Sequence, residues 1–394
     1  MSETLLSQAI RLLDRLVAFQ TISSRSNLEL IEFIEEYLSV FEVSSRRYYD
    51  ETRQKANLWA TVGPEESRGI VWSGHTDVVP VEGQAWDSDP FTLRNDGKRL
   101  FGRGTTDMKG FLACALALVP DLARRKLDRP IHLCFSYDEE IGCIGVRSVI
   151  NDIASWPIKP VGCIVGEPSN MKVVIGHKTK RSLRVKVTGT SAHSSLAPQS
   201  VNAVHFASLL VSKIVEIAER LGRDGPVDND FSVPVSTGHV GTMHGGTQLN
   251  LVPNLCTFEF EFRVLPEQNA DALVDELQQF ARYTLLPQMH KIDPTTDISF
   301  DLMAAFPGLS IKESDPWVAF CKHASRTNDV SKVAYGAEAG LFQQTAAVPT
   351  VICGPGHIKE AHTPNESVAI SELAKCLDVL RMSATTPYIA PRSV

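Results

Sequence analysis

Short apolar strands alternate with amphipathic helices along the first part of the chain, and this alternation constrains the fold most strongly. Residues 69–73 (GIVWS) and 161–165 (VGCIV) are apolar on both faces, which is typical of strands buried in a parallel sheet. Apolar residues recur at helical spacing over 5–19, 28–41 and 107–125. The pattern predicts an α/β domain whose helices cover a central, mostly parallel sheet.

The pattern changes in the middle of the chain. Residues 181–188 (RSLRVKVT) alternate strictly between apolar and polar side chains, which predicts a half-buried antiparallel strand. A long amphipathic helix is predicted over 201–221. Further strands are predicted over 232–240, 255–264 and 298–303. We therefore expect an α+β domain of residues 180–303, inserted into an α/β domain made of residues 1–179 and 304–394.

The composition indicates a globular protein that acts on small molecules. Hydrophobic residues make up 43% and charged residues 22% of the chain, and 39 basic side chains face 46 acidic ones. A net charge of -7 does not suit a nucleic-acid-binding protein, so we expect no nucleic-acid partner. The most apolar stretch, 110–120, is shorter than the roughly 20 residues that span a bilayer, so we expect no membrane partner. The eight cysteines form no CxxC pair, which favours free thiols in a cytoplasmic protein.

Polar residues with metal-binding chemistry lie in five short motifs. The motifs are SGHTD (73–77), GRGTTDMKG (102–110), DEEIG (138–142), GEP (166–168) and AHTPNE (361–366). They supply two imidazoles and three carboxylates: His75, Asp107, Glu140, Glu167 and His362. Because sites in open α/β sheets form at the carboxyl ends of strands, we expect these side chains to converge. Mixed histidine and carboxylate ligands favour zinc, with cobalt or manganese as alternatives.

Each motif also has an ordinary structural explanation. Alone, His75 could be a packed core histidine, Asp107 a helix N-cap and the acidic run an exposed turn. Neighbours on an extended chain point in opposite directions, so one of Glu139 and Glu140 could bind metal while the other acts on water. Asp77 could hold the second ring nitrogen of His75. Five ligands are too many for one tetrahedral zinc but suit a pair that shares a carboxylate, which leaves Glu139 as the natural general base.

Taken together, SGHTDVVP, GRGTTDMKG, DEEIG, GEPS and AHTPNE resemble the family of acetylornithine deacetylase and succinyl-diaminopimelate desuccinylase. This family consists of co-catalytic zinc amidohydrolases and peptidases, and the resemblance covers essentially the whole chain. It implies two zinc sites: His75, Asp107 and Glu167 for one, and the bridging Asp107, Glu140 and His362 for the other. It also implies that Asp77 orients His75, that Glu139 is the general base, and that the Asp107–Met108 peptide bond is cis.

The resemblance extends to the inserted domain, for which it implies a lid that also mediates dimerisation. Residues 189–194 (GTSAHS) resemble the lid motif of the family. His193 would then reach the active site of the neighbouring subunit of a homodimer and stabilise the oxyanion. Asn250 and Arg263 match substrate-contact positions, and Arg263 would pair with a substrate α-carboxylate. The alternative for Arg263 is an ordinary surface arginine at a strand edge.

Two further segments discriminate within the family. Residues 335–342 (YGAEAGLF) and 354–356 (GPG) resemble the acetylornithine branch, although Ala337 replaces the usual threonine. Glu338 would attract the side-chain ammonium group of ornithine, and Gly354 would also contact the substrate. The expected reaction is hydrolysis of the amide bond of N2-acetyl-L-ornithine. The alternatives are deacylation of another N-acyl amino acid, cleavage of peptides as a dipeptidase or carboxypeptidase, and a non-catalytic dimer that has kept the fold.

Overall fold

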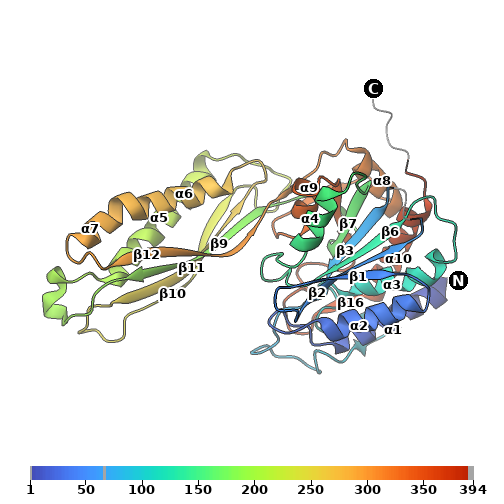
Figure 1. The fold of residues 1–394 in the computed structure, drawn as a ribbon, viewed down its shortest axis with the longest axis horizontal. Coiled ribbons are helices and arrows are strands. Elements are labelled where there is room, and N and C mark those ends of the chain that lie inside the picture. The colour runs from blue at the N-terminus through green and yellow to red at the C-terminus, as the bar shows by residue number, and fades with distance from the viewer. Residues whose placement is uncertain (1, 65–67, 389–394) are drawn as a thin grey trace. The chain divides into compact units, whose positions relative to one another are not determined.

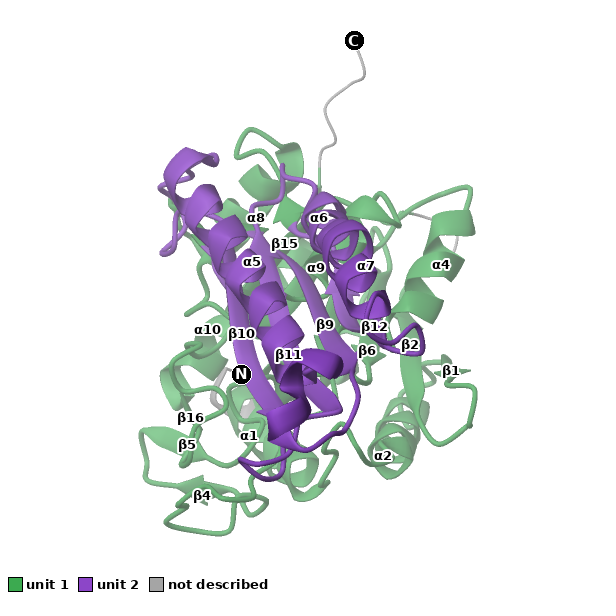
Figure 2. Ribbon diagram, turned by 90° about the vertical axis from the view of Figure 1, so that its left-hand side faces the viewer, with its two compact units in different colours: residues 1–176, 309–332, 337–394 green, residues 177–308, 333–336 purple. Residues whose placement is uncertain are grey.

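The computed structural model describes residues 2–64 and 68–388, which form two compact units (Figures 1 and 2). Unit 1 comprises residues 1–176, 309–332 and 337–394, and unit 2 comprises residues 177–308 and 333–336. The predicted domain boundaries lie within a few residues of these. The short segment 333–336 belongs to unit 2, whereas the sequence predicts it to be part of the α/β domain.

Unit 1 is built on a large sheet in which the strand order is β1-β2-β6-β3-β7-β15-β8-β13, with β14 paired to β8. Its four central strands are parallel and buried: β6 (Ile131–Ser136), β3 (Ile70–His75), β7 (Gly162–Pro168) and β15 (Thr350–Gly354). The outer strands are β1 (Ser45–Tyr49), β2 (Ala56–Val62), β8 (Val173–His177), β13 (Leu309–Ser310) and β14 (Val330–Val333). Antiparallel pairing occurs on both sides of the parallel centre. The predicted mostly parallel sheet is therefore confirmed.

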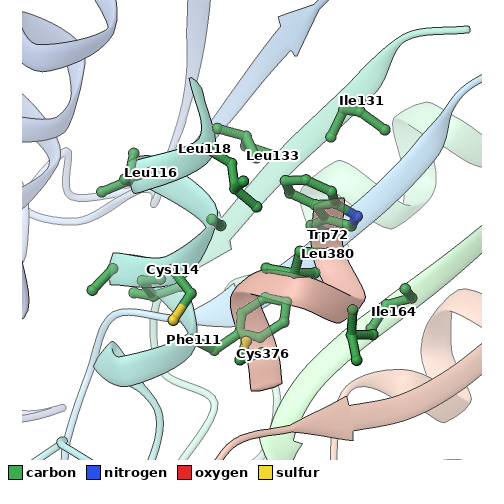
Figure 3. Packing of buried hydrophobic residues seen from close by; sticks show 14 of the residues in the cluster. Trp72, Phe111, Cys114, Leu116, Leu118, Ile131, Leu133, Ile164, Cys376 and Leu380 are labelled. Atoms are coloured by element: carbon green, nitrogen blue, oxygen red, sulfur yellow. The ribbon is translucent and has the colours of Figure 1, made fainter. Parts of the chain in front are cut away.

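Helices cover this sheet, and the most deeply buried of them is α3 (Lys109–Leu122). Its small and apolar side chains allow close packing against α1 (Ser2–Ala18) and α10 (Ile370–Thr385). The other helices of unit 1 are α2 (Leu28–Ser39), α4 (Arg147–Ser155), α8 (Pro316–Ser325) and α9 (Ala339–Gln344). Figure 3 shows Phe111 of α3 and Leu380 of α10 close to Trp72 of β3 in the core of this unit. The indole N–H of Trp72 donates to Ser383 Oγ at 3.1 Å, so this large side chain is anchored as well as buried.

Unit 1 also contains a small separate sheet. It joins β16 (Ser367–Ala369), β5 (Arg99–Phe101) and β4 (Arg94–Asn95) in that order. Residues 367–369 directly follow the AHTPNE motif, and residues 99–101 directly precede the GRGTTDMKG motif. The pairing of β16 with β5 therefore brings these two motifs together, although about 260 residues separate them in the sequence.

Unit 2 has the predicted α+β fold. Its sheet has the strand order β10-β11-β9-β12 and antiparallel pairing throughout. The strands are β9 (Thr179–Thr188), β10 (Thr237–Gly245), β11 (Leu255–Val264) and β12 (Asp297–Phe306). The helical segments are η1 (Ser194–Gln199), α5 (Ala203–Asp224), α6 (Ala270–Phe280), η2 (Ala281–Leu285) and α7 (Leu286–His290). Alternate side chains of β11 are buried against α5 and α6, so this sheet has one core-facing side.

Two expectations about the chain as a whole can be compared with the structure. All eight cysteines are free, as predicted, and all of them are buried. Among the described residues, no helix has both the length and the apolar character that crossing a membrane requires.

Candidate active site

The predicted ligands of unit 1 meet beyond the carboxyl ends of its parallel strands. His75 is the last residue of β3, and Glu167 lies near the end of β7. Glu140 lies in the turn that follows β6, and Asp107 immediately precedes the N-cap of α3. His362 lies on the loop before β16. The topology of the chain therefore brings all five side chains together. They meet beyond the carboxyl ends of the strands, where sites in open α/β sheets form.

Asp107 lies between the two imidazoles. Its Oδ1 is 2.9 Å from His75 Nε2, and its Oδ2 is 3.3 Å from His362 Nε2. His75 Nε2 also lies 3.7 Å from Glu167 Oε1, and His362 Nε2 lies 3.0 Å from Glu140 Oε2. Each oxygen of Asp107 thus faces a different histidine, and each histidine has a second carboxylate beside it. The Asp107–Met108 peptide bond is cis.

This cluster has the chemistry of a cation site. Ligand atoms of His75, Asp107 and Glu140 lie within 4.8 Å of one another, and so do those of His75, Glu139 and Glu167. Glu167 Oε1 is buried and has no hydrogen-bond partner within the described residues. A buried carboxylate oxygen without a partner is costly unless an ion or donor completes it. The residues present therefore fit a metal, although Glu139 is also within reach, so its assignment as the general base stays a prediction.

The charge states of the cluster also favour binding of a cation. Burial raises the pKa of Glu139 to about 8, and repulsion from Glu140 and Asp107 adds to this shift. Burial raises the pKa of Glu140 to about 7, again with repulsion from Asp107. Hydrogen bonds to Asp107 and Glu140 raise the pKa of His362 to about 10. Since neighbouring carboxylates disfavour each other's ionised forms, a bound cation would stabilise the charges that now repel.

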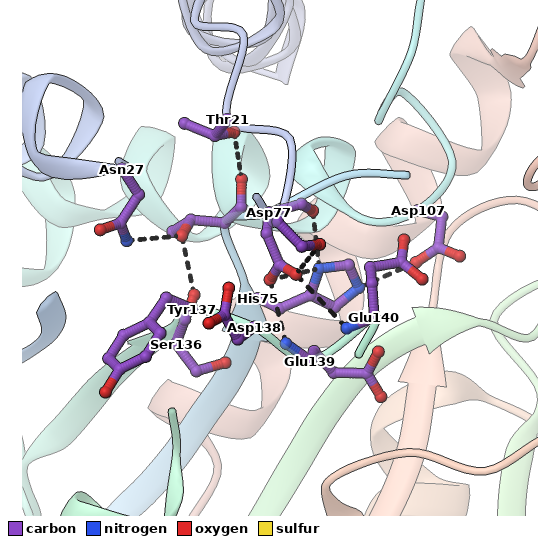
Figure 4. A network of polar contacts seen from close by, with 12 residues as sticks. Thr21, Asn27, His75, Asp77, Asp107, Ser136, Tyr137, Asp138, Glu139 and Glu140 are labelled. Carbon is purple, nitrogen blue, oxygen red and sulfur yellow. Dashed lines mark hydrogen bonds and ion pairs between the residues drawn. The ribbon is translucent and has the colours of Figure 1, made fainter. Parts of the chain in front are cut away.

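Asp77 makes more contacts than the predicted one with His75. His75 Nδ1 is 2.9 Å from the main-chain oxygen of Asp77 and 3.5 Å from its Oδ1. The carboxylate also accepts a hydrogen bond from the Ser23 hydroxyl at 2.7 Å. It accepts two more from the main-chain N–H groups of Glu139 and Glu140, at 3.2 and 3.3 Å (Figure 4). Asp77 therefore supports both the histidine ring and the turn that carries the two glutamates. Sequence reasoning missed Ser23, for which no motif gave a signal.

The three predicted residues of the inserted domain lie in unit 2. His193 is exposed, and its Nδ1 lies 2.8 Å from the Ser195 hydroxyl. Asn250 is exposed as well. The guanidinium of Arg263 donates to Glu261 on the same strand at 2.7 Å. The contacts of these residues with a substrate or a neighbouring subunit stay predictions.

The side chain of Glu338 is almost completely buried, with 1% of its surface exposed. Its side chain is part of the buried core, and its two oxygens accept hydrogen bonds from the hydroxyls of Ser73 on β3 and Ser136 on β6, at 2.5 and 2.8 Å. Both oxygens are thus engaged within the protein, and contact with a substrate ammonium group stays a prediction. Gly354 is tightly packed, because a Cβ atom there would lie 1.9 Å from the Gly166 carbonyl oxygen.

The fold and the cluster of histidines and carboxylates fit a metal-dependent hydrolase. The chain belongs to peptidase family M20/M25/M40, whose sequence model matches residues 71–385. This match confirms the family resemblance inferred from the five motifs.

Curated relatives cover most of the chain. Acetylornithine deacetylase of Buchnera aphidicola subsp. Acyrthosiphon pisum (strain APS) is 29% identical over 357 residues, which are 89% of this chain and 90% of that protein. Acetylornithine deacetylase of Aliivibrio salmonicida (strain LFI1238) is 31% identical over 326 residues, 83% of each chain. The protein of the same name from Edwardsiella ictaluri (strain 93-146) is 30% identical over 372 residues, 92% of this chain and 93% of that one.

Solved structures share the fold at lower identity. The M20 family metallo-carboxypeptidase Sso-CP2 from Sulfolobus solfataricus superposes with a TM-score of 0.77 at 17% identity, covering 96% of this chain and 98% of that one. The di-peptidase Dug1p from Saccharomyces cerevisiae superposes with a TM-score of 0.76 at 14% identity, covering 97% of this chain and 96% of that one. These similarities extend over both units.

Proposed function

We propose that this protein hydrolyses N2-acetyl-L-ornithine to L-ornithine and acetate. The observation that carries the proposal is the buried cluster around Asp107, in which two histidines and additional carboxylates converge with Glu139 beside them. The relatives named acetylornithine deacetylase, at 29–31% identity over most of both chains, support this substrate. The reaction would supply ornithine for arginine synthesis in the cytoplasm, a reducing compartment that suits eight free thiols.

Two divalent ions would be held by the cluster, with zinc expected and cobalt or manganese able to substitute. One ion would take His75, Asp107 and Glu167, and the other would take Asp107, Glu140 and His362. Once bound, the pair would polarise the substrate carbonyl and make water more acidic. Asp107 would be shared, which agrees with its two oxygens facing different histidines.

Glu139 would carry the proton. Its carboxylate would take a proton from the attacking water and then pass it to the nitrogen of the leaving amine. Burial raises the pKa of Glu139 to about 8. This carboxylate therefore holds a proton more readily than an exposed carboxylate does. Asp77 would assist, because its carboxylate accepts a hydrogen bond from the main-chain N–H of Glu139. This bond fixes the turn that carries Glu139. The thiol of Cys143 donates to Glu139 Oε1 at 3.3 Å and limits the orientations of this carboxylate.

We infer that the protein acts as a homodimer in which unit 2 is the lid. His193 would contribute from the neighbouring subunit by stabilising the oxyanion that forms at the substrate carbonyl. Its exposure on unit 2 supports a role that needs an accessible imidazole. Asn250, Arg263, Glu338 and Gly354 remain the proposed substrate contacts, with Arg263 pairing with the α-carboxylate.

A substrate panel tests the proposed reaction. Protein loaded with zinc or cobalt should be given N2-acetylornithine, other N-acetyl amino acids, N-succinyl-diaminopimelate and dipeptides. We expect the highest kcat/KM for N2-acetylornithine. Faster turnover of another N-acyl amino acid would keep the chemistry but overturn the substrate, and faster cleavage of dipeptides would favour a peptidase.

A further inference from the structure

A buried polar network connects the loop that carries Asp107 with the loop that carries His362. Its two charged members, Arg103 and Glu366, are 1% and 0% exposed, and their side chains form an ion pair at 2.7 Å. Sequence reasoning assigned neither residue, although both lie in motifs that it singled out. The available signal was their opposite charge within two motifs that were expected to converge.

Glu366 holds the main chain at the start of the bridging aspartate. Its Oε1 accepts hydrogen bonds from the N–H groups of Thr106 at 2.9 Å and of Asp107 at 3.0 Å. Its Oε2 accepts from Arg103 Nη1. Buried main-chain N–H groups require partners, and two consecutive ones bonded to a single oxygen fix the local orientation of the chain. Glu366 thereby fixes the main-chain position from which the Asp107 side chain extends, without bonding to the Asp107 carboxylate.

Arg103 and Gln84 extend this connection to His362. Arg103 Nη2 donates to Gln84 Oε1 at 2.5 Å, and Gln84 Nε2 donates to the main-chain oxygen of His362 at 2.8 Å. His362 has a φ of 61°, in the left-handed region that non-glycine residues adopt only when neighbouring contacts hold them there. The Gln84 amide supplies one of these contacts. Arg103 Nη1 also reaches the main-chain oxygen of Thr363 at 3.4 Å.

We propose that Glu366, Arg103 and Gln84 act as a positioning network that sets the separation of Asp107 and His362, and with it the metal affinity of the site formed by these two residues and Glu140. The inference rests on the proposed function, because it requires that these side chains hold an ion. Residues that orient metal ligands typically change metal affinity by about 10–100-fold when they are altered. The three residues are positioning residues, since none lies among the predicted ligands.

Two variants of the 394-residue chain test the network. In Glu366→Gln the charge that pairs with Arg103 is removed, and this variant could fail to fold because Glu366 is fully buried. Gln84→Glu is the decisive variant, because Gln84 is only half-buried. This change keeps an oxygen acceptor for Arg103 and removes the donor to His362. Metal-free protein should be titrated with Co²⁺ and followed by its visible absorption, which reports ligand geometry, and by thermal unfolding.

Gln343→Glu is the matched control. Gln343 also bonds to the main chain on both sides, donating to the Ser310 oxygen at 2.6 Å and accepting from the Ser310 N–H at 2.9 Å. The same amide-to-acid change is therefore made away from the site. We expect this control to bind two equivalents of Co²⁺ with wild-type affinity and spectrum.

For Gln84→Glu we expect one of the two Co²⁺ equivalents to bind about tenfold more weakly, with an altered absorption spectrum and a thermal midpoint like that of the control. A variant that matches wild type in both affinities and in its spectrum would overturn the positioning role. Weakened binding that appears equally in the control would overturn it as well. Wild-type protein that takes up no Co²⁺ would instead overturn the proposed function on which the inference rests.

Discussion

Single residues decide the charge balance of the candidate site. Asp107 faces both histidines, so its two oxygens divide the cluster into a His75 side and a His362 side. Burial removes water from these carboxylates, and each ionised group then raises the free energy of ionising the next. Protonation and metal binding must therefore compete for the same oxygen and nitrogen atoms.

Metal affinity should depend steeply on pH. In the metal-free protein the pKa of Glu140 is raised to about 7 and that of His362 to about 10, so both carry protons at pH 6. A metal must displace these protons, so affinity rises as pH rises. We expect the apparent dissociation constant for Co²⁺ to fall by about tenfold per pH unit for each proton displaced. Titrations between pH 6 and 8, with proton release followed by an indicator dye, measure this, and a flat affinity without proton release would contradict it.

The role of Glu338 can be tested by separating stability from substrate binding. Glu338→Ala should lower the free energy of unfolding by about 2–3 kcal/mol, because the Ser73 and Ser136 hydroxyls lose their buried acceptor. Guanidinium unfolding measures this loss, and Glu313→Ala, on the surface beside Lys322, is the control that should change little. Unchanged stability would contradict this structural role, and a raised KM for N2-acetylornithine would support the proposed contact of Glu338 with the substrate.

At the scale of elements, close approach between β7 and α3 depends on a glycine. A Cβ atom on Gly166 would lie 2.0 Å from the ring of Phe111. Gly166→Ala should therefore overpack this contact and destabilise the protein by about 1–3 kcal/mol. Gly222 in α5 is the matched control, since a Cβ there meets nothing within 4 Å and alanine favours the helix by up to about 1 kcal/mol. Thermal unfolding of both variants checks this, and effects of the same sign would contradict the packing argument.

The elements that the sequence predicted well are those whose burial pattern is local. Apolar runs identified β3 and β7, and helical spacing identified α1, α2 and α5. The strand expected over 232–240 is only partly right, because β10 begins at Thr237 and continues to Gly245. Pro234 cannot donate a ladder hydrogen bond, which explains the later start.

Elements that depend on distant partners were not predicted. The strand β1 has the polar sequence SRRYY, and its pairing with β2 arises from tertiary contacts. The residues of the candidate site were likewise predicted only where a local motif contains them. Motifs identified the side chains that could bind metal, whereas no motif indicated which groups bond to the main chain around them. Glu366 lies within a motif, but its bonds to the main-chain N–H groups of Thr106 and Asp107, and the role of Gln84, were identified only from the structure.

For the whole molecule, the proposed homodimer makes a specific prediction about subunit mixing. His193→Ala and Glu139→Ala homodimers should each be nearly inactive. Mixed subunits should regain activity, because one of the two sites in a heterodimer then combines an intact Glu139 with an intact His193 from the partner subunit. Activity after mixing, with heterodimers isolated by two affinity tags, measures this. Heterodimers without activity would rule out action across the subunit interface.

The central claim concerns Glu139 at a metal-dependent hydrolytic site, and one comparison tests it most directly. Wild type and Glu139→Ala should be loaded with zinc, assayed for metal content, and then compared in turnover of N2-acetylornithine. We expect two zinc ions per subunit in both proteins, with kcat lowered by at least about a hundredfold in the variant because the general base is missing. Wild-type turnover in a fully loaded variant would contradict the assignment of Glu139 as the base.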